Sequence, residues 1–159
     1  MIRVVLVLLL ALGLLSLSTC ERKANDILPA DPSKVSGEWK LVEPATAYEI
    51  TLRLAIDPAA QTIAGALPYR VAGRSAVNQY FALATFGKTT ENGSSRDDGA
   101  SFGAVGATKM AGPPEAMQVE ADYFRNLQAV YRFELTSRHR LRLHYRGEQP
   151  GVLIYEKKE

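Results

Sequence analysis

Several separate segments of this chain alternate apolar and polar residues, and this alternation restricts the fold more than any other feature of the sequence. Residues 131–136 and 140–146 alternate in this way. Residues 48–56 place five apolar side chains on one face, namely Tyr48, Ile50, Leu52, Leu54 and Ile56. A period of two over such lengths is typical of antiparallel strands with one buried face. Shorter runs indicate further strands at 37–42, 61–65, 79–86, 101–105 and 152–155.

One segment has a helical period instead. Pro113 and Pro114 suit a first helical turn. Four apolar residues follow at spacings of four, three and three, namely Met117, Ala121, Phe124 and Leu127. We expect them to form a stripe that packs on the core. Glu120 is expected to lean toward this side of the helix. The sequence therefore predicts an α+β fold, mostly antiparallel β, in which a closed or partly closed barrel carries one helix at about residues 113–128. The side chains expected to be buried around one centre are Trp39, Leu52, Leu54, Phe124, Leu127, Phe133 and Leu143.

Residues 88–99 are poor in apolar side chains. The pair Asn92–Gly93 is typical of a tight hairpin turn, and we expect the rest of this segment to be a mobile loop. Asn92, Asp97 and Asp98 supply oxygen atoms, but their spacing is not that of an EF-hand, so a calcium site is the less favoured interpretation.

The N-terminus has the pattern of an export signal. Residues 4–15 are apolar except for Gly13, and this run is too short to span a membrane but suits the apolar part of a signal peptide. Leu17-Ser18-Thr19-Cys20 then resembles a bacterial lipobox, in which a lipid is joined to the cysteine sulfur before cleavage ahead of it. We therefore predict a lipoprotein signal peptide at 1–19 and lipidation of Cys20. The alternative is an ordinary signal peptide cleaved nearby, which leaves Cys20 as a free thiol.

The expected anchor also predicts a location. Position 21 is Glu, whereas Asp there resembles an inner-membrane retention signal of enteric bacteria. We therefore expect a protein of the cell envelope that is anchored in the outer membrane and faces the periplasm. Residues 20–34 contain Pro29 and Pro32 and have no apolar period, so they are expected to be a tether. The folded domain is then expected at 35–159.

Composition excludes several classes of function. The 159 residues are 47% hydrophobic and 23% charged with a net charge of +2, which suits one globular domain and argues against a chain that coats nucleic acid. The single cysteine excludes a disulfide framework and a zinc site built from several thiolates. His139 and His144 would project to opposite faces of a strand, so we expect no metal site. Because no Gly-x-Ser-x-Gly elbow and no phosphate-binding Gly-rich loop are present, we expect neither an enzyme nor a cofactor.

The segment near residue 140 carries a row of basic side chains. They recur at every second position and therefore lie on one side of a strand: Arg138, Arg140, Arg142, His144 and Arg146. The functional interpretation is a surface that contacts anionic lipid headgroups or an acidic protein. The alternative is a solvated strand face whose charges protect a sheet edge, with Glu134 and Glu148 as candidate acids opposite the row.

Four ordered motifs carry a resemblance to a known family. They are Gly37-Glu38-Trp39-Lys40-Leu41, the segments 73–80 and 107–113, and the helix pattern around Glu120. Over about residues 35–156 they resemble the META domain family, whose bacterial members include the heat-shock protein HslJ. The family positions, which we interpret as structural, are Trp39, Gly73, Asn78, Tyr80, Thr108, Met110 and Glu120. Where many members have cysteines this chain has Val77 and Gly112, and the resemblance implies that these two positions are near neighbours.

Two of these family positions allow a functional interpretation beside the structural one. Asn78 is expected to satisfy nearby backbone groups, as such side chains do in turns, and the alternative is a ligand contact. Glu120 is expected to form an ion pair or a cap to a neighbouring strand. Its alternative role is that of a buried acid with a raised pKa.

The resemblance implies a binding or scaffold role in envelope maintenance or stress tolerance rather than a reaction. With the expected anchor, the predicted partners are the membrane and, as a candidate, an envelope protein, with no nucleic acid. One alternative is a pilotin-like chaperone that holds a hydrophobic segment of a partner, which an open apolar groove would favour. The other is a periplasmic hydrolase inhibitor that acts through an exposed loop at 88–100, which a rigid protruding loop would favour.

Overall fold

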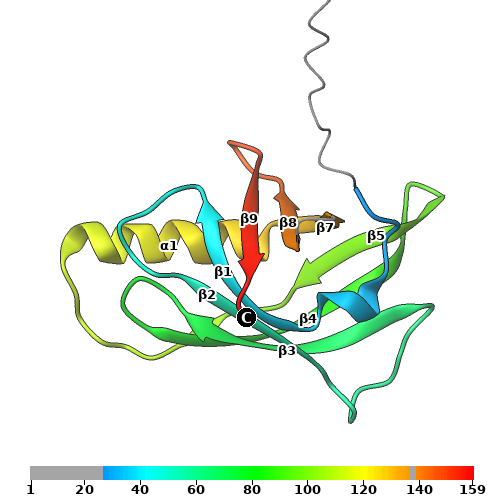
Figure 1. The fold of residues 1–159 in the computed structure, drawn as a ribbon, viewed down its shortest axis with the longest axis horizontal. Helices are drawn as coiled ribbons and strands as arrows, with labels where there is room; N and C mark the ends of the chain where they lie inside the picture. The colour runs from blue at the N-terminus through cyan, green and yellow to red at the C-terminus, as the bar shows by residue number, and fades with distance from the viewer. Residues whose placement is uncertain (1–26, 137–138) are drawn as a thin grey trace, which may run out of the picture.

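The computed structural model describes residues 27–136 and 139–159, which form a closed antiparallel barrel with one α-helix (Figure 1). Eight strands close the barrel in the order β3-β2-β1-β9-β8-β7-β5-β4, with β4 paired back onto β3. Their bounds are β1 Gly37–Glu43, β2 Thr51–Ile56, β3 Ala66–Arg74, β4 Gln79–Glu91, β5 Ser94–Phe102, β7 Val130–Thr136, β8 Arg140–Tyr145 and β9 Gly151–Lys157. The short β6 (Gly106–Ala107) pairs with β4. The predicted fold class is confirmed, whereas the predicted signal peptide, Cys20 and the first part of the tether lie outside the described residues.

Alternate residues of the strands fill the barrel. Six of the seven side chains predicted to share one core are at most 2% exposed: Trp39, Leu52, Leu54, Leu127, Phe133 and Leu143. Phe86 lies at their centre and packs edge to face against Tyr69, Phe102 and Phe133, with ring centroids 5.3–5.7 Å apart. The period of two in the sequence therefore does mark the strands that face this core.

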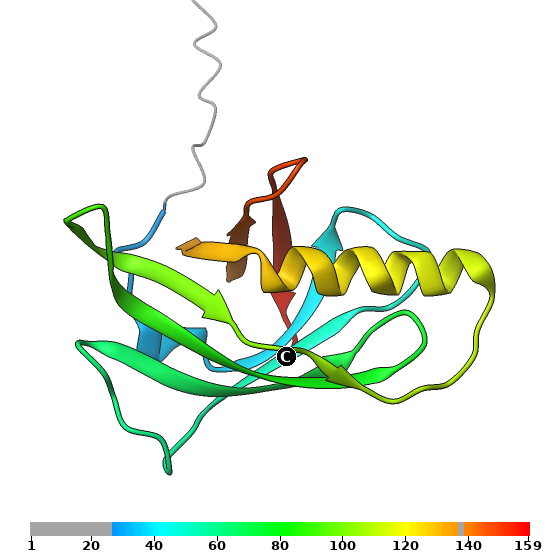
Figure 2. The same ribbon diagram turned by 180° about the vertical axis from the view of Figure 1, so that it is seen from behind.

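Helix α1 (Pro114–Gln128) lies across one side of the strands and leads directly into β7 (Figure 2). Its buried face consists of Ala116, Glu120, Tyr123 and Leu127. The predicted stripe is confirmed at Leu127 and at the half-buried Phe124, which packs against the core, and Glu120 does lean inward; it was wrong at Met117, which is 38% exposed, and at Ala121, which is exposed. The reason is that the polar atoms of Glu120 and Tyr123 have partners inside the fold, so both side chains can be buried. In the described part of the chain, no helix is long and apolar enough to cross a membrane.

The strand predicted at 61–65 was wrong. This segment is a turn, in which Ala64 and Gly65 have φ angles of 51° and 88° and reverse the chain in a conformation that extended strands do not adopt. The long strand β3 follows it and was not predicted. Pro68, Arg70 and Gly73 interrupt the apolar pattern of β3, which hides the strand from a search for alternation.

The segment 88–100 is an ordered hairpin, not the predicted mobile loop. β4 and β5 continue through it, with Glu91 opposite Ser94 and Thr89 opposite Arg96. Asn92 and Gly93 have φ angles of 49° and 78°, as a two-residue hairpin turn requires. In Figure 1 this hairpin extends at the end of the molecule opposite the start of α1. Its strands are polar because most of their side chains here are exposed.

Candidate functional site

Asn78 is the centre of a buried polar cluster between the β3–β4 turn, the segment after β6 and α1. Its side chain is 2% exposed. Its Oδ1 accepts hydrogen bonds from the Met110 N–H and from Thr108 Oγ1, both at 2.8 Å. Its Nδ2 donates to Glu120 Oε1 at 2.7 Å. Asn78 therefore does satisfy backbone groups, but these are the N–H and the carbonyl of Met110, 32 residues away, and not groups of its own turn as predicted.

The Glu120 carboxylate accepts the remaining donors of this turn. Its Oε2 accepts from the Ser75 hydroxyl and from the N–H groups of Asn78 at 2.9 Å and Val77 at 3.3 Å. Burial raises the pKa of Glu120, but the hydrogen bonds from Ser75, Asn78 and Val77 outweigh it, so the pKa lies below its ordinary value. Glu120 is therefore an ionised cap of the turn, and its low pKa does not suit it to be a proton donor at neutral pH.

Gly73 and Tyr80 face each other across the β3–β4 pair. A Cβ on Gly73 would lie 2.1 Å from Thr51 O and 2.7 Å from Tyr80 Cε1, so a side chain has no room there. The Tyr80 hydroxyl donates to Thr51 O at 2.8 Å and bonds the Tyr123 hydroxyl at 2.7 Å. Tyr155 in turn donates to Tyr123 at 3.1 Å. Burial raises the pKa of these three tyrosines, so all three hydroxyls are neutral.

The family positions are thus used inside the molecule. Trp39 Nε1 donates to Val35 O at 2.9 Å, and the other positions belong to the contacts just described. Thr108 and Met110 are exposed, Met110 at 56%, but the Thr108 hydroxyl and the Met110 backbone N–H join the cluster. Each position has a packing or hydrogen-bonding contact within the fold.

The predicted basic row lies on the outer face of β8, and acids oppose it. Arg140 bonds Glu156 at 2.6 Å and Arg146 bonds Glu91 with two nitrogens at 2.6 and 3.0 Å. Arg142 lies 3.6 Å from Glu134. Glu134 was a predicted opposing acid, whereas Glu91 and Glu156 were not. Arg138 lies outside the described residues, and the four described members of the row are close to acids rather than a free cationic surface.

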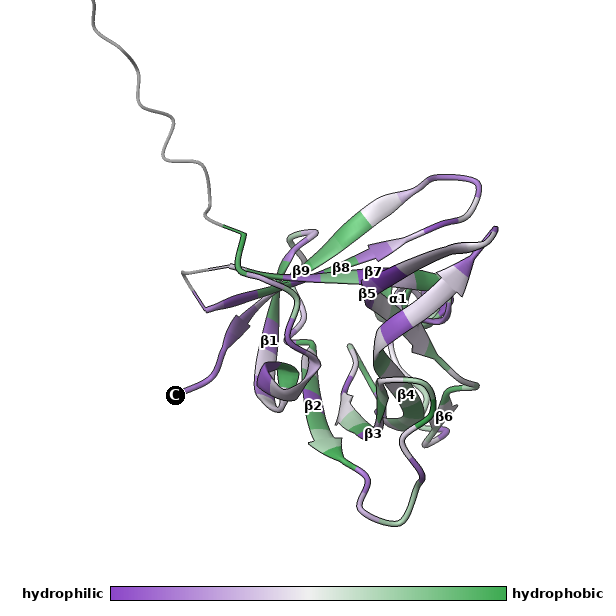
Figure 3. Cartoon of the chain, turned by 90° about the vertical axis from the view of Figure 1, so that its right-hand side faces the viewer, coloured by the Kyte–Doolittle hydropathy of each residue, from purple (hydrophilic) through white to green (hydrophobic). Residues whose placement is uncertain are grey.

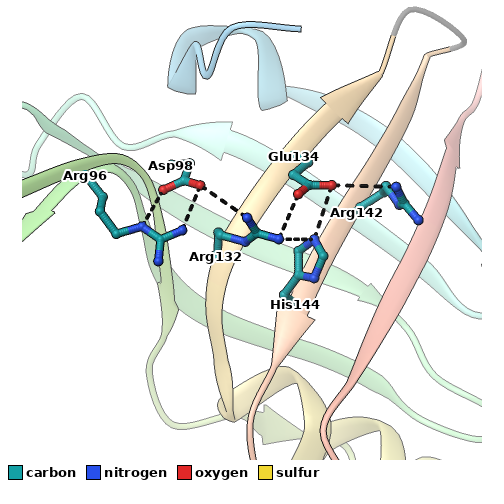
Figure 4. Close-up of polar contacts among 6 residues, drawn as sticks. All are labelled: Arg96, Asp98, Arg132, Glu134, Arg142 and His144. Atoms are coloured by element: carbon teal, nitrogen blue, oxygen red, sulfur yellow. Dashed lines mark hydrogen bonds and ion pairs between the residues drawn. The ribbon is translucent and has the colours of Figure 1, made fainter. Parts of the chain in front are cut away.

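A row of charged side chains runs from β5 across β7 to β8 (Figure 4). Asp98 bonds Arg96 at 2.9 and 3.0 Å and lies 3.8 Å from Arg132. Arg132 Nη2 lies 2.8 Å from Glu134 Oε1. The bonds from Arg96 are the main reason that the pKa of Asp98 is lowered, although burial opposes them. Charges of both signs therefore alternate along this outer wall.

His144 completes the row but leaves one oxygen of Glu134 without a hydrogen bond. Burial is the main cause that lowers the pKa of His144, so the ring is neutral at pH 7. Its Nε2 lies 3.2 Å from Arg132 Nη2, and because arginine only donates, this nitrogen is the acceptor. It therefore cannot also donate to Glu134 Oε2, 3.3 Å away.

A groove of about 490 Å³ lies beside this charged row. One wall is the segment at 27–30, which we call the strap, and the other includes Asp97, Asp98, Arg132 and Glu134. The strap is held to the end of β7: Ile27 bridges Thr136, and the Leu28 N–H donates to Leu135 O at 2.9 Å. Figure 3 shows its apolar start in green where the described chain begins. This part of the predicted tether thus contacts the barrel.

Three buried side-chain atoms within the described residues have no hydrogen-bond partner, and all three belong to β7. They are Arg132 Nε, Glu134 Oε2 and Thr136 Oγ1. These residues alternate with the buried Phe133 and Leu135, so they share the outer face of the strand. Buried polar atoms are normally paired, so this face is the part of the described molecule with the most unused hydrogen-bonding capacity. Sequence reasoning missed it, because the strap that covers it is distant in sequence.

The described residues hold no group of three His, Cys, Asp or Glu side chains that could bind a metal ion. His139 lies in the β7–β8 turn with a φ of 54°, apart from the charged row. The chemistry available at the groove is therefore hydrogen bonding, ion pairing and apolar contact.

Comparison with known proteins gives a family and a fold. A family model of the META domain matches residues 34–158. The solved NMR structure of a protein from Burkholderia xenovorans is similar with a TM-score of 0.55 and 19% sequence identity, over 84% of this chain and 90% of that one. At this identity the likeness concerns the fold alone. A search of curated proteins found no match.

Proposed function

Because this chain belongs to the META domain family, we propose that it is a binding domain of the cell envelope, anchored by a lipid on Cys20, rather than an enzyme. One observation carries this proposal. The family positions are used up in internal contacts, whereas the unused polar atoms and the groove lie together on the outside of β7. Within the described residues, this distribution supports a binding surface on the outside of β7 more than a reactive site.

The proposed anchor would hold this groove near the membrane. Six residues lie between Cys20 and Ile27, the first residue of the strap, so seven Cα–Cα steps join the two. A chain of that length spans at most roughly 25 Å even when fully extended. Two or three acyl chains on Cys20 and its amino group would keep the protein durably in the bilayer. The groove would then face partners that lie at or close to the membrane surface.

We propose that its role is to hold a partner protein during envelope maintenance or stress. The apolar strap and the groove beside it favour the chaperone-like form of this role, in which a segment of the partner is held. The outer membrane, on its periplasmic side, is the proposed location, since position 21 is Glu.

A second candidate function rests on the hairpin at 88–100. It extends past the barrel as an ordered element, and Arg146 holds Glu91, the residue before the turn at its tip, through two hydrogen bonds. A rigid protruding hairpin suits insertion into the cleft of an envelope hydrolase. Insertion of residues at Asn92–Gly93 would abolish such inhibition and leave partner binding at the groove unchanged.

The anchor is tested by growing cells with labelled palmitate and separating their membranes. We expect the wild-type protein to carry label and to sediment with outer membranes, and we expect the Cys20→Ser variant to lose both properties. Recovery of Cys20→Ser in membranes at the wild-type level would contradict the anchor.

A further inference from the structure

The seam between β5 and β7 has the fewest paired residues of the junctions that close the barrel. These strands share a single register pair, Gly99 with Arg132. Each of the other junctions that close the barrel has at least four such pairs. The β5 side of β7 beyond Arg132 is therefore not covered by β5, and the strap lies there instead.

Within the described residues, the strap covers only the end of β7 and leaves its own apolar side chains exposed. Among the described contacts it makes one backbone hydrogen bond to β7, from the Leu28 N–H to Leu135 O at 2.9 Å. Its two large apolar side chains remain in water, with Ile27 58% exposed and Leu28 39% exposed. Pro29 follows and has no N–H to extend the pairing. Beneath it, Glu134 has a side chain only 10% exposed and an oxygen without a hydrogen bond.

From these observations we propose that the groove takes an extended peptide segment of a partner protein, which adds to β7 as a strand in place of the strap. The strap is then an internal competitor that occupies the seam until the partner arrives. This inference rests on the proposed binding function and names the class of partner.

The chemistry of the seam favours a peptide over other ligands. A strand added along Phe133–Thr136 would be held by main-chain hydrogen bonds of the kind that Leu28 makes now. The apolar side chains of such a segment would occupy the places of Ile27 and Leu28. Polar side chains on the same segment would reach the unpaired atoms of Arg132, Glu134 and Thr136. A sugar would need an exposed aromatic platform, and the aromatic residue in the lining of the groove, Phe133, is fully buried.

The strap's own sequence supplies the probe. A fluorescein-labelled peptide of residues 25–31 is titrated into the detergent-solubilised, full-length mature protein, and binding is followed by fluorescence anisotropy. The Leu28→Pro variant lacks the N–H that bonds Leu135, so its strap competes less. We expect it to bind the peptide about tenfold more tightly than the wild type, because apparent affinity scales with the fraction of open sites.

A matched peptide tests the main-chain bond itself. When its leucine is N-methylated, the peptide keeps its side chains but loses the donor, and we expect binding to fall by about tenfold or more. Amide exchange in the wild type provides a readout that needs no variant. Excess peptide is expected to speed exchange at the Leu28 amide while the amides of β8 stay protected.

Several results would overturn the inference. They are absence of peptide binding to both proteins, equal binding of the N-methylated peptide, and binding of a muropeptide or an anionic vesicle at this face in place of the peptide. Exchange of straps between two copies, seen as a dimer that survives excess peptide, would also overturn it. The peptide assay does not depend on the lipid anchor. If the peptide does not bind but Cys20 still carries labelled palmitate, the proposal of a peptide partner is wrong, while the proposed function as an envelope binding domain still stands.

Discussion

A Cβ atom placed on Gly112 would lie 3.5 Å from the Cβ of Val77. Disulfides join Cβ atoms that are about 3.5–4.5 Å apart. The two positions at which many family members have cysteines are therefore neighbours here, as the resemblance implied. Gly112 does not have a positive φ, so a cysteine at this position would not strain the backbone.

The first prediction is that Val77→Cys and Gly112→Cys together form a disulfide during export. The ring would enclose residues 77–112, and chain entropy suggests a gain of about 3–4 kcal/mol in the free energy of unfolding. Thiol labelling and thermal unfolding in a Cys20→Ala background measure the bond and its effect. Val77→Cys alone is the control and should stay reduced. Free thiols in the oxidised double variant would show that the placement is wrong.

The second prediction concerns the Glu120 cap. Glu120→Gln puts a donor where Ser75, Val77 and Asn78 already donate, so we expect a loss of about 2–4 kcal/mol in the free energy of unfolding. Ser75→Ala, which removes one donor and leaves the carboxylate, should cost less. Equal stability of Glu120→Gln and the wild type in urea unfolding would contradict the capping role.

The pH dependence of unfolding gives a third prediction from the same residue. Because the pKa of Glu120 is lower in the folded protein, the unfolded chain takes up the proton first as the pH falls. The stabilisation is complete above the ordinary glutamate pKa and is lost progressively below about pH 5. Glu120→Gln should therefore show a flatter decline in this range. Parallel stability curves for the two proteins would exclude a lowered pKa.

Much of the fold follows from the sequence because the features involved are local. Alternation marks β2, β7 and β8, and the paired prolines with a helical period mark α1. The face that α1 buries followed only in part, because an apolar stripe includes Met117 and omits Tyr123, whose burial depends on Tyr80 and Tyr155 far away in the chain. β3 was missed for a related reason. Pro68 and Gly73 interrupt its apolar pattern, and their presence in a strand is understood only from the neighbouring strands.

The candidate site was less accessible to sequence reasoning. The basic row of β8 was identified, but its acids Glu91 and Glu156 come from other strands. The strap meets β7 through Ile27 and Thr136, more than 100 residues apart. Residues 21–33 are polar and contain two prolines, a composition typical of a tether, so the sequence did not indicate that part of this segment contacts the end of β7.

The fourth prediction compares the two proposed faces of α1. Leu127 is fully buried, so Leu127→Ala should cost about 2–5 kcal/mol in the free energy of unfolding. Met117 is 38% exposed, so Met117→Ala should change it by no more than about 0.5 kcal/mol. Chemical denaturation of both variants measures the difference. Similar losses in the free energy of unfolding for the two variants would indicate that Met117 faces the core, as the sequence predicted.

Gly73 provides a fifth prediction. Gly73→Ala would force a methyl group against Thr51 O and the Tyr80 ring, and we expect a loss of about 1–3 kcal/mol or more in the free energy of unfolding. Gly103→Ala is the matched control, since its nearest contact would be an ordinary 3.5 Å from Leu83 O. A Gly73→Ala protein as stable as the control would show that Tyr80 does not need this glycine.

Site-specific photo-crosslinking in cells tests whether the groove is the functional face. The crosslinking amino acid replaces Asp97, in the lining of the groove, Asn92, in the exposed turn of the hairpin, or Ala72, an exposed residue of β3; the last two lie outside that lining. We predict one discrete protein adduct from position 97, none from positions 92 and 72, and loss of the adduct when Cys20→Ser releases the protein from the membrane. An adduct from position 72 with none from position 97 would place the partner on another face and contradict the proposed site.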